Sequence, residues 1–338
     1  MLPTTLLTAK TVAFCIPYSS SGCSCVARPA EVEGIVRDAA ETRRRACANA
    51  AVQHTVVGGG GSVSDDDDEA EVSDDRDPTL CSLTIRVRQP APAVVAGSIG
   101  SKLWDASLLM SSWLLENPSH FPQPKADGRR PRVLELGAGL GLVGLALSLA
   151  LPTVAVTLSD YDTAVLLYLD ESIRLNFPLG AAAPPETALV DFRDFGHQSH
   201  AAFLDGGGAL DGALRRYAAE GLLGAFDLII ASDVVYSENH STDLATVLLA
   251  LLKPEPTASQ PGSEVVRDAD WQPCALLCLP DSRPRLSEFV AGLHTAGLCC
   301  RIERVERGCR MSRRLRREFD GWGADASFSM YHVTRAVR

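Results

Sequence analysis

The feature that most constrains the fold is a regular alternation of short apolar stretches with helix-forming patterns, which begins near residue 132. Strands that alternate with helices along a chain form βαβ units, and these units build a parallel sheet with helices on both faces. Strands are expected at residues 132–136, 154–158, 187–191, 226–232 and 274–279, with helices at residues 142–151, 163–176, 243–252 and 286–296. The order breaks at residues 301–307 and 327–336, where two strand patterns follow each other without a helix between them. The sequence therefore predicts an α/β domain whose seven-stranded, mostly parallel sheet closes on an antiparallel pair.

Two further elements are expected before this alternation begins. Residues 81–87 place an apolar side chain at every second position, which is typical of a half-buried strand. An amphipathic helix should begin near Asp105 and end before Pro118, because the residue that precedes a proline avoids the helical conformation. Residues 196–224 and 254–273 are longer than typical connections, so we expect them to be mobile surface insertions.

Residues 1–79 form an N-terminal extension that we expect to be mostly disordered. A glycine run at residues 58–61 and an acidic run at residues 65–69 cannot bury enough apolar surface to offset the chain entropy that folding removes. Residues 1–30 contain no Asp or Glu and several Ser and Thr, which leaves an organelle-targeting segment open as an alternative to a plain tail. The folded domain is accordingly expected over residues 80–338.

Composition disfavours several classes of protein. No apolar run approaches the ~20 residues of a membrane span, so we expect no contact with a membrane. The ten cysteines are scattered, and Cys274 and Cys278 lie inside apolar runs, which favours reduced thiols in a cytoplasmic protein and no metal centre. The net charge of -10 argues against a nucleic-acid partner, because nucleic-acid binding requires clustered Lys and Arg.

The strongest chemical signal is the segment VLELGAGLG at residues 133–141, in which an apolar strand runs into a glycine turn and then a helix. Glycines let the backbone turn tightly and let a ligand approach the free N–H groups of the helix N-terminus. Dinucleotide enzymes use the spacing Gly-x-Gly-x-x-Gly to hold a pyrophosphate. Here the third glycine comes one residue earlier, which fits S-adenosylmethionine, because the amino-acid end of that cofactor carries no phosphate. The expected cofactor-binding residues of this segment are Glu135, Gly137, Ala138, Gly139 and Gly141.

Acidic residues follow the next two strands. Asp160 ends the second strand, where a carboxylate can accept hydrogen bonds from both ribose hydroxyls of a nucleoside. A helix cap is the alternative role, and Asp162 also fits it. Asp191 and Phe192 follow the third strand and could hold the adenine amine and flank the adenine ring. The alternative is an acid of the loop beside a core phenylalanine.

A third acid follows the central fourth strand. Ligands of such sheets bind beyond the carboxyl ends of the strands, so Ser232 would reach the cofactor and Asp233 would lie where a methyl group is transferred. The alternative is that Asp233 is a loop acid without a role in chemistry.

Four segments together resemble methyltransferase family 16, the seven-strand protein-lysine methyltransferases of non-histone proteins. They are LWDA at residues 103–106, ELGAGLGLVG at 135–144, LSDY at 158–161 and DVVY at 233–236. The resemblance covers roughly residues 80–337 and implies a Rossmann-like Class I methyltransferase fold with S-adenosylmethionine as cofactor. It departs from the family pattern at Phe192, where the family often has tryptophan, and in the N-terminal extension and the insertions.

The resemblance also implies roles for single residues. Trp104 would border the cofactor pocket, the three glycines would hold the methionine end, and Asp160 would bind the ribose. Asp233 would orient the substrate lysine by hydrogen bonding, and Tyr236 would form a wall of the lysine slot. The family acts on proteins such as translation factors and chaperones, so a protein substrate is expected.

Three alternatives stay open from the sequence. A methyltransferase for RNA or for a small molecule is one, although many nucleic-acid amino-group enzymes carry Asn/Asp-Pro-Pro-aromatic where this chain has DVVY at residues 233–236. A scaffold that keeps the fold without catalysis is another.

Residues 310–317 are rich in arginine and could bind an acidic surface of the protein substrate or a nucleic acid, or could simply be an exposed basic segment.

Overall fold

The computed structural model describes residues 7–17, 80–90, 100, 102–123, 128–178, 181, 183–196, 212–237, 240–254, 271–305 and 327–336. A seven-stranded sheet forms the centre of the domain, in the order β5-β4-β3-β6-β7-β9-β8. Five strands are parallel: β3 (Arg132–Leu136), β4 (Ala155–Asp160), β5 (Glu186–Leu189), β6 (Leu228–Ser232) and β7 (Cys274–Pro280). Strand β9 (Phe328–Arg335) pairs antiparallel with both β7 and β8 (Leu298–Val305). The predicted fold class is therefore confirmed, including the antiparallel pair at the end.

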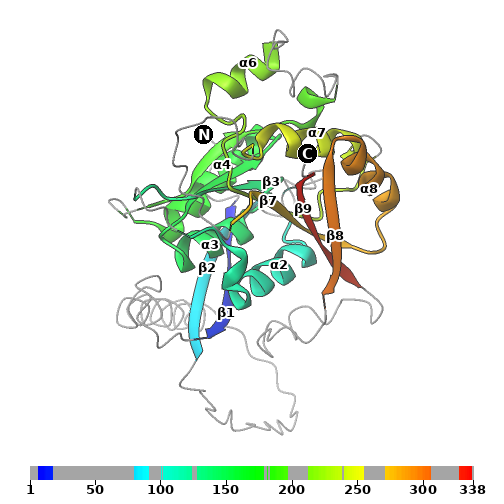
Figure 1. The fold of residues 1–338 in the computed structure, drawn as a ribbon. Coiled ribbons are helices and arrows are strands. Elements are labelled where there is room, and N and C mark those ends of the chain that lie inside the picture. The colour runs from blue at the N-terminus through cyan, green and yellow to red at the C-terminus, as the bar shows by residue number, and fades with distance from the viewer. Residues whose placement is uncertain are drawn as a thin grey trace, which may run out of the picture.

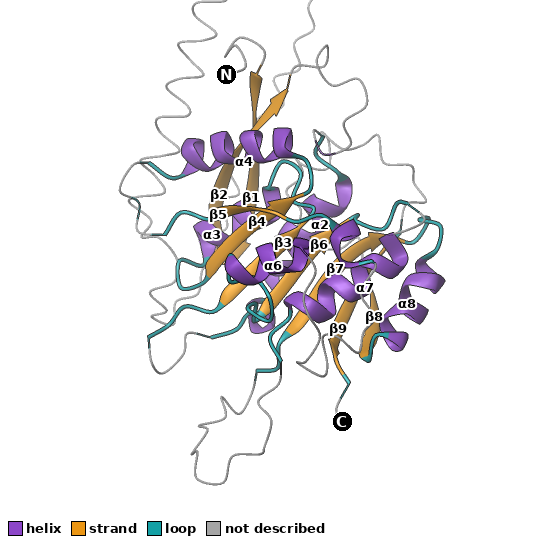
Figure 2. Ribbon diagram, turned by 90° about the horizontal axis from the view of Figure 1, so that it is seen from above, coloured by secondary structure: helices purple, strands orange, loops and turns teal. Residues whose placement is uncertain are grey.

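Helices cover both faces of this sheet (Figure 1). One core contains side chains of α2 (Asp105–Glu116), α3 (Leu142–Ala150) and α4 (Thr163–Asn176), together with strand residues such as Val133 and Leu158. The other core contains side chains of α6 (Gly212–Ala219), α7 (His240–Leu251) and α8 (Leu286–Thr295). Figure 2, a view turned by 90°, shows the strands side by side with α6, α7 and α8 in front of them.

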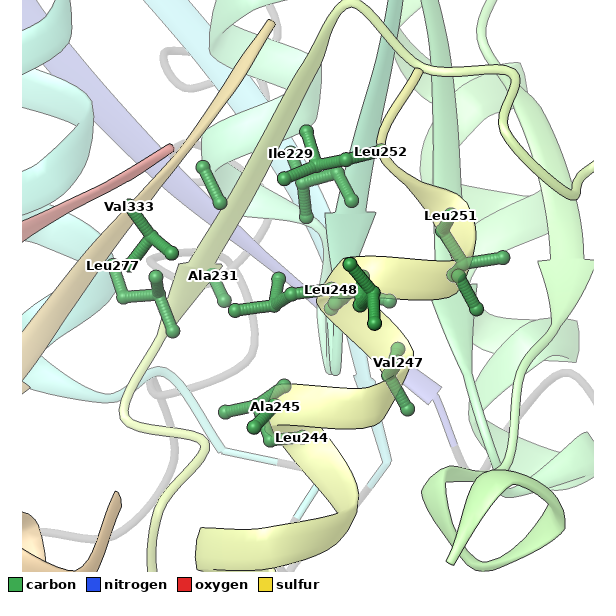
Figure 3. Close-up of a cluster of buried hydrophobic side chains, with 14 of the residues drawn as sticks. Ile229, Ala231, Leu244, Ala245, Val247, Leu248, Leu251, Leu252, Leu277 and Val333 are labelled. Atoms are coloured by element: carbon green, nitrogen blue, oxygen red, sulfur yellow. The ribbon is translucent and has the colours of Figure 1, made fainter. Parts of the chain in front are cut away.

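The central strands are buried because apolar side chains of both faces meet a helix layer. Figure 3 shows Leu248 of α7 beside β6, which carries Ile229 and Ala231, and Leu244 and Leu251 belong to the same cluster of buried side chains. All five side chains are fully buried. Burial on both faces explains why β6 reads as a continuous apolar run instead of an alternating one.

Helix α2 begins at Asp105, and Trp104 is the residue that precedes its first turn. The helix ends at Asn117, whose side-chain nitrogen donates to the carbonyl oxygen of Trp113 at 2.7 Å. Pro118 follows and begins the short helix η4 (Pro118–His120), so the predicted end of α2 is confirmed. The position of Trp104 at this helix start brings its side chain to the carboxyl edge of the sheet.

The N-terminal extension contains a strand that the sequence analysis missed. Strand β1 (Leu7–Pro17) pairs antiparallel with β2 (Leu80–Pro90), so this stretch of the extension, which we expected to be mostly disordered, forms a strand. Its pairing partner lies more than sixty residues away in the sequence, and the composition of the extension carries no sign of it. Residues 18–79, with the glycine run and the acidic run, lie outside the described residues.

Strand β2 is attached to the domain by helix α4. The backbone N–H of Arg86 donates to Asn176 Oδ1 at 2.9 Å, and that of Arg88 donates to Ser172 Oγ at 2.8 Å. Ile85 lies on the fully buried face, as the alternating pattern predicted. The side chains of α4 thus satisfy backbone groups of β2 that no strand pairs on that side.

The first predicted insertion is partly structured. Helix α6 lies within residues 196–224, which corrects the expectation of a mobile loop for that part. Leu214 and Tyr217 of this helix are fully buried and anchor it to the domain. Residues 197–211 and 255–270, which make up most of the two insertions, lie outside the described residues. Within the part of the chain that is described, no helix combines the length and apolarity needed to cross a membrane.

Candidate active site

A pocket of about 240 Å³ opens at the carboxyl ends of the parallel strands. It lies where the strand order changes direction between β3 and β6, which is where open α/β sheets bind their ligands. Loops after four strands and the segment before α2 contribute its walls. Of the residues predicted from the sequence, the pocket is lined by Trp104, Gly137, Ala138, Gly139, Asp160, Asp191, Phe192, Ser232, Asp233 and Tyr236.

The glycine turn after β3 forms the floor of the pocket. Gly137 and Gly139 have φ angles of 59° and 53°, in the left-handed region that glycine adopts without strain. A Cβ on Gly139 would lie 3.1 Å from the carbonyl oxygen of Gly100, which also lines the pocket. The turn can therefore approach a ligand closely only because these positions carry no side chain.

Two residues of the glycine motif, Glu135 and Gly141, are not among the residues that line the pocket. Gly141 precedes α3 with a φ angle of 76°, and a Cβ there would lie 2.5 Å from Leu169 Cδ2. Glu135 is buried, and its Oε2 accepts a hydrogen bond of 2.8 Å from the backbone N–H of Gly144. Burial raises the pKa of Glu135 to about 8. Both residues thus support the turn and the start of α3 from beneath, and their contact with the cofactor stays a prediction.

Asp160 connects the ends of β3 and β4. Its Oδ2 accepts from the backbone N–H of Gly139 at 3.1 Å, and its Oδ1 accepts from that of Asp162 at 3.1 Å. Burial raises the pKa of Asp160, although these backbone donors favour the ionised form. Asp162 is the helix cap, with its side chain accepting from Ala164 N at 2.8 Å. The carboxylate of Asp160 is thereby held at the pocket wall by backbone donors, with further lone pairs left for a ligand.

The loop after β5 carries Asp191 and Phe192. Arg193 forms an ion pair with Asp191, with 2.6 Å between Nη2 and Oδ2, and this hydrogen-bonded guanidinium lowers the pKa of Asp191. The Phe192 ring packs edge-on against His240 at 5.6 Å between centroids. Phe192 is therefore part of the pocket wall, while the carboxylate of Asp191 is already engaged by a neighbouring cation.

Asp233 follows β6 with a φ angle of 54°, one of two non-glycine residues with a positive φ in the described chain. Asp tolerates this conformation better than most residues, and such backbone outliers gather at functional sites. Its backbone N–H donates to the carbonyl oxygen of Cys278 at 3.0 Å, which holds the turn against β7. Both carboxylate oxygens accept hydrogen bonds from Arg283, at 2.6 Å each. The sequence analysis missed Arg283, because it lies in the loop after another strand.

Tyr236 stands beside this turn and packs edge-on against His240, with 4.5 Å between ring centroids. Burial raises the pKa of Tyr236 to about 12, with smaller contributions from the charges of Tyr161, Asp160 and Asp233. The tyrosine therefore stays protonated at neutral pH and can donate a hydrogen bond.

Several lining residues were not predicted, among them Lys102, Tyr161, Arg193 and His240. Tyr161 belongs to the LSDY segment and Lys102 is close to LWDA, so the neighbouring motifs were the available signal. His240 begins α7, and its Nδ1 lies 2.9 Å from the carbonyl oxygen of Val234. No sequence pattern marks that contact.

Two predictions concern other parts of the molecule. The arginine-rich stretch at residues 310–317 lies outside the described residues. Among the residues that the structure does describe, no group of three or more His, Cys, Asp or Glu side chains could hold a metal ion.

The strand order, the terminal antiparallel pair and the pocket above the glycine turn define the class of this protein, which has the Class I methyltransferase fold. Residues 91–187 match the family model described as lysine methyltransferase. This match bears out the resemblance to methyltransferase family 16 that the motifs indicated.

Individual relatives agree with this assignment. The chain is 30% identical over 169 residues to the protein-lysine N-methyltransferase EEF2KMT of Mus musculus, which covers 50% of this chain and 44% of that protein. It is 27% identical over 158 residues to a UPF0665 family protein of Schizosaccharomyces pombe, covering 47% of this chain and 40% of that protein. A calmodulin-lysine N-methyltransferase of Arabidopsis thaliana is 26% identical, with 44% of this chain and 40% of that protein covered. The chain thus spans less than half the length of these relatives.

Proposed function

We propose that this chain is an S-adenosylmethionine-dependent methyltransferase that transfers a methyl group to a lysine side chain of a non-histone protein. The observation that carries the proposal is the meeting of two sets of residues in one pocket. Gly139 and Asp160 lie on one side, at a distance of 3.1 Å between backbone nitrogen and carboxylate, and Asp233 and Tyr236 lie at the end of the adjacent strand. The family match and the relatives named as protein-lysine methyltransferases support the same reaction.

The pocket residues fit this cofactor. The glycine turn, where a Cβ on Gly139 would crowd the carbonyl oxygen of Gly100 at the pocket, suits the methionine end, and the buried carboxylate of Asp160 suits a ribose. Trp104, Ala138 and Ser232 complete the walls, and Phe192 would flank the adenine ring. S-adenosylmethionine, when bound, supplies a methyl group on a positively charged sulfur.

The residues of the chain would then position the lysine amine for direct, in-line transfer. The bond from methyl carbon to lysine nitrogen forms as the bond from carbon to sulfur breaks, and the amine releases a proton to solvent. Free lysine has a pKa near ~10.4, so the site must favour the neutral amine. Asp233 would accept a hydrogen bond from that amine and aim its lone pair, and Tyr236 would close the slot. Positioning of this kind needs neither a metal ion nor a covalent intermediate.

The substrate is proposed to be a protein of the translation-factor or chaperone class, as the family resemblance implies. We propose that the enzyme acts in the cytoplasm, and targeting by residues 1–30 remains the alternative. Reduced thiols at Cys274 and Cys278 fit a reducing compartment. The acidic net charge of -10 supports protein over nucleic acid as substrate.

Transfer of radiolabelled methyl from S-adenosylmethionine into cell lysate tests this proposal. The full chain is compared with Asp233→Ala and with the control Asp281→Ala, an exposed acid of the loop after β7. We expect label in a discrete band that protease removes and nuclease does not, present with the control and absent with Asp233→Ala. Cofactor binding by Asp233→Ala must be intact, as measured by calorimetry with S-adenosylhomocysteine.

Other outcomes would contradict parts of the proposal. Label that nuclease removes would identify RNA as the substrate. Near-normal transfer by Asp233→Ala would show that this carboxylate does not orient the amine. Cofactor binding without transfer to any macromolecule in several lysates would favour a scaffold.

A further inference from the structure

The carboxylate of Asp233 is already paired with a cation before any substrate arrives. Arg283 Nε lies 2.6 Å from Oδ1, and Nη2 lies 2.6 Å from Oδ2. This is a bidentate pair, the strongest and most directional arrangement of arginine with a carboxylate. The Asp233 side chain is 6% exposed and that of Arg283 is 30% exposed, so solvent screens the pair incompletely.

Arg283 approaches from the loop that follows β7, the strand beside β6. It is not among the residues that line the pocket, whereas Asp233 and Trp104 both are. Its guanidinium carbon lies 5.8 Å from the centroid of the Trp104 ring. The guanidinium therefore sits against a wall made by Asp233 and Trp104, and pairs with the carboxylate from behind that wall.

The charge of Arg283 changes what Asp233 can do to an amine. A lone carboxylate favours the charged form of a neighbouring amine and raises its pKa, which opposes methyl transfer. A carboxylate paired with a guanidinium keeps lone pairs for hydrogen bonding but exerts a much weaker net field. Two demands on Asp233, namely to orient the amine and to leave it neutral, are met together only when its charge is balanced.

Other ionisable groups face the same space and must be taken into account. They include cations and anions from the segment before α2, the loops after β4, β5 and β6, and helix α7. The groups are Lys102, Asp160, Tyr161, Asp191, Arg193, Tyr236 and His240. Arg193 is paired with Asp191, and Asp160 accepts backbone hydrogen bonds, whereas Arg283 is the cation paired with Asp233.

We propose that Arg283 is a positioning residue that clamps Asp233 and balances its charge, so that the lysine amine is held in its neutral, nucleophilic form. The inference rests on the proposed function, because it assigns Arg283 a role toward the lysine amine whose hydrogen bond Asp233 would accept. It makes Arg283 a determinant of the pH at which the site works.

Two S-adenosyl ligands test the charge at this position without a known protein substrate. S-adenosylhomocysteine is neutral at its sulfur, and sinefungin carries a protonated amine where the methyl group would be. Calorimetry on the full chain gives the ratio of their dissociation constants. We expect Arg283→Met, which keeps a long side chain but removes the charge, to shift the ratio at least about fivefold in favour of sinefungin. Arg283→Lys, which keeps the charge, should retain a ratio close to that of the wild type.

An unchanged ratio in Arg283→Met would overturn the inference. If that variant does not fold, Asp233→Asn gives a second measurement, because it leaves the guanidinium unbalanced and should weaken sinefungin relative to S-adenosylhomocysteine. An unchanged ratio there would also overturn it. Failure of the wild type to bind either ligand would instead contradict the proposed function.

A kinetic readout follows once a labelled band is found. The rate of transfer by Arg283→Met should fall at pH 7 and recover toward the wild-type rate near pH 9, because the uncompensated carboxylate raises the pKa of the bound amine. A purely structural role would lower the rate equally at both pH values.

Discussion

The hydroxyl of Tyr217 accepts a hydrogen bond of 3.0 Å from the backbone N–H of Asp191. The same hydroxyl donates to Asp194 Oδ2 at 2.7 Å, and the tyrosine side chain is fully buried. Helix α6, which lies inside an expected insertion, is thus hydrogen-bonded to the loop after β5, which forms part of the pocket wall. The insertion contributes to the candidate site through the backbone of that loop.

Tyr217→Phe should therefore loosen the loop after β5. The substitution leaves the partly buried N–H of Asp191 without its acceptor, which costs about 1–3 kcal/mol of unfolding free energy. We expect a lower melting temperature and weaker binding of S-adenosylhomocysteine, measured by thermal unfolding and calorimetry. Tyr168→Phe, at a buried tyrosine of α4, is the control and should leave ligand affinity unchanged. Equal affinity of both variants for the ligand would show that the hydrogen bond from α6 to this loop does not affect ligand binding.

The glycines of the turn should separate into two kinds when each is replaced by alanine. Gly141→Ala places a Cβ against Leu169 and holds it in the left-handed region, at a cost of about 1–2 kcal/mol for the backbone alone. This variant should lose stability but keep its ligand affinity when folded. Gly139→Ala should instead lose ligand affinity, because its Cβ points at Gly100 in the pocket. Thermal unfolding and calorimetry on both variants test this prediction. An equal loss of ligand affinity in Gly139→Ala and Gly141→Ala would contradict it.

The buried carboxyl group of Glu135 should make the stability of the fold depend on pH. Its pKa rises from 4.5 to about 8 on folding because the side chain is buried. The folded state then binds the proton more tightly than the unfolded state, so this contribution to stability is complete below pH 4.5 and is lost as the pH rises toward 8. Glu135→Gln removes the titration, and should become more stable relative to the wild type as the pH rises from 5 to 8, by about 4 kcal/mol at pH 8. Exposed Glu186→Gln serves as the control, and parallel pH profiles for Glu135→Gln and the wild type would refute the prediction.

Arg335 of β9 caps the C-terminus of helix α7. Its guanidinium donates to the carbonyl oxygens of Leu249, Leu252 and Lys253. These carbonyls lie at and just beyond the end of the helix, where the last carbonyl groups generally receive no intrahelical N–H and where the helix dipole favours a cation. Arg335→Met should lower the unfolding free energy by about 1–3 kcal/mol in a denaturant titration, while Arg304→Met on exposed β8 should change it little. A midpoint of Arg335→Met equal to that of the wild type would show that water replaces the cap at no cost.

The main elements of the domain were predictable because each carries a local signal. Helix α4 occupies the predicted residues 163–176, since its apolar spacing, the capping Asp162 and the following Phe177–Pro178 all agree. Strand β1 was missed because only its distant partner β2 reveals it. Helix α6 was missed because the glycine run at Gly206–Gly208, just upstream of it, is typical of a flexible loop.

The residues of the candidate site likewise fall into two groups: those that a local sequence signal marks and those that it does not. Residues at strand ends, such as Asp160 and Asp233, were predicted to lie together because parallel strands end at one edge of the sheet. Glu135 was assigned to the ligand from its place in a motif, but the direction of its side chain follows from the pleat of β3 and the start of α3. Arg283 and Tyr217 reach the site from loops and helices distant in sequence, so no motif contains them together with their partners.

The place of β9 between β7 and β8 has a consequence for the order in which the chain can fold during synthesis. A ribosome makes β3 to β8 first, yet β7 and β8 are not hydrogen-bonded to each other and both pair with a strand that is synthesised later. Met330 and Val333 of that strand are fully buried, so the nascent domain exposes apolar surface until residues 328–335 emerge. A premature stop codon anywhere before this strand should therefore produce an aggregation-prone product instead of a shortened enzyme.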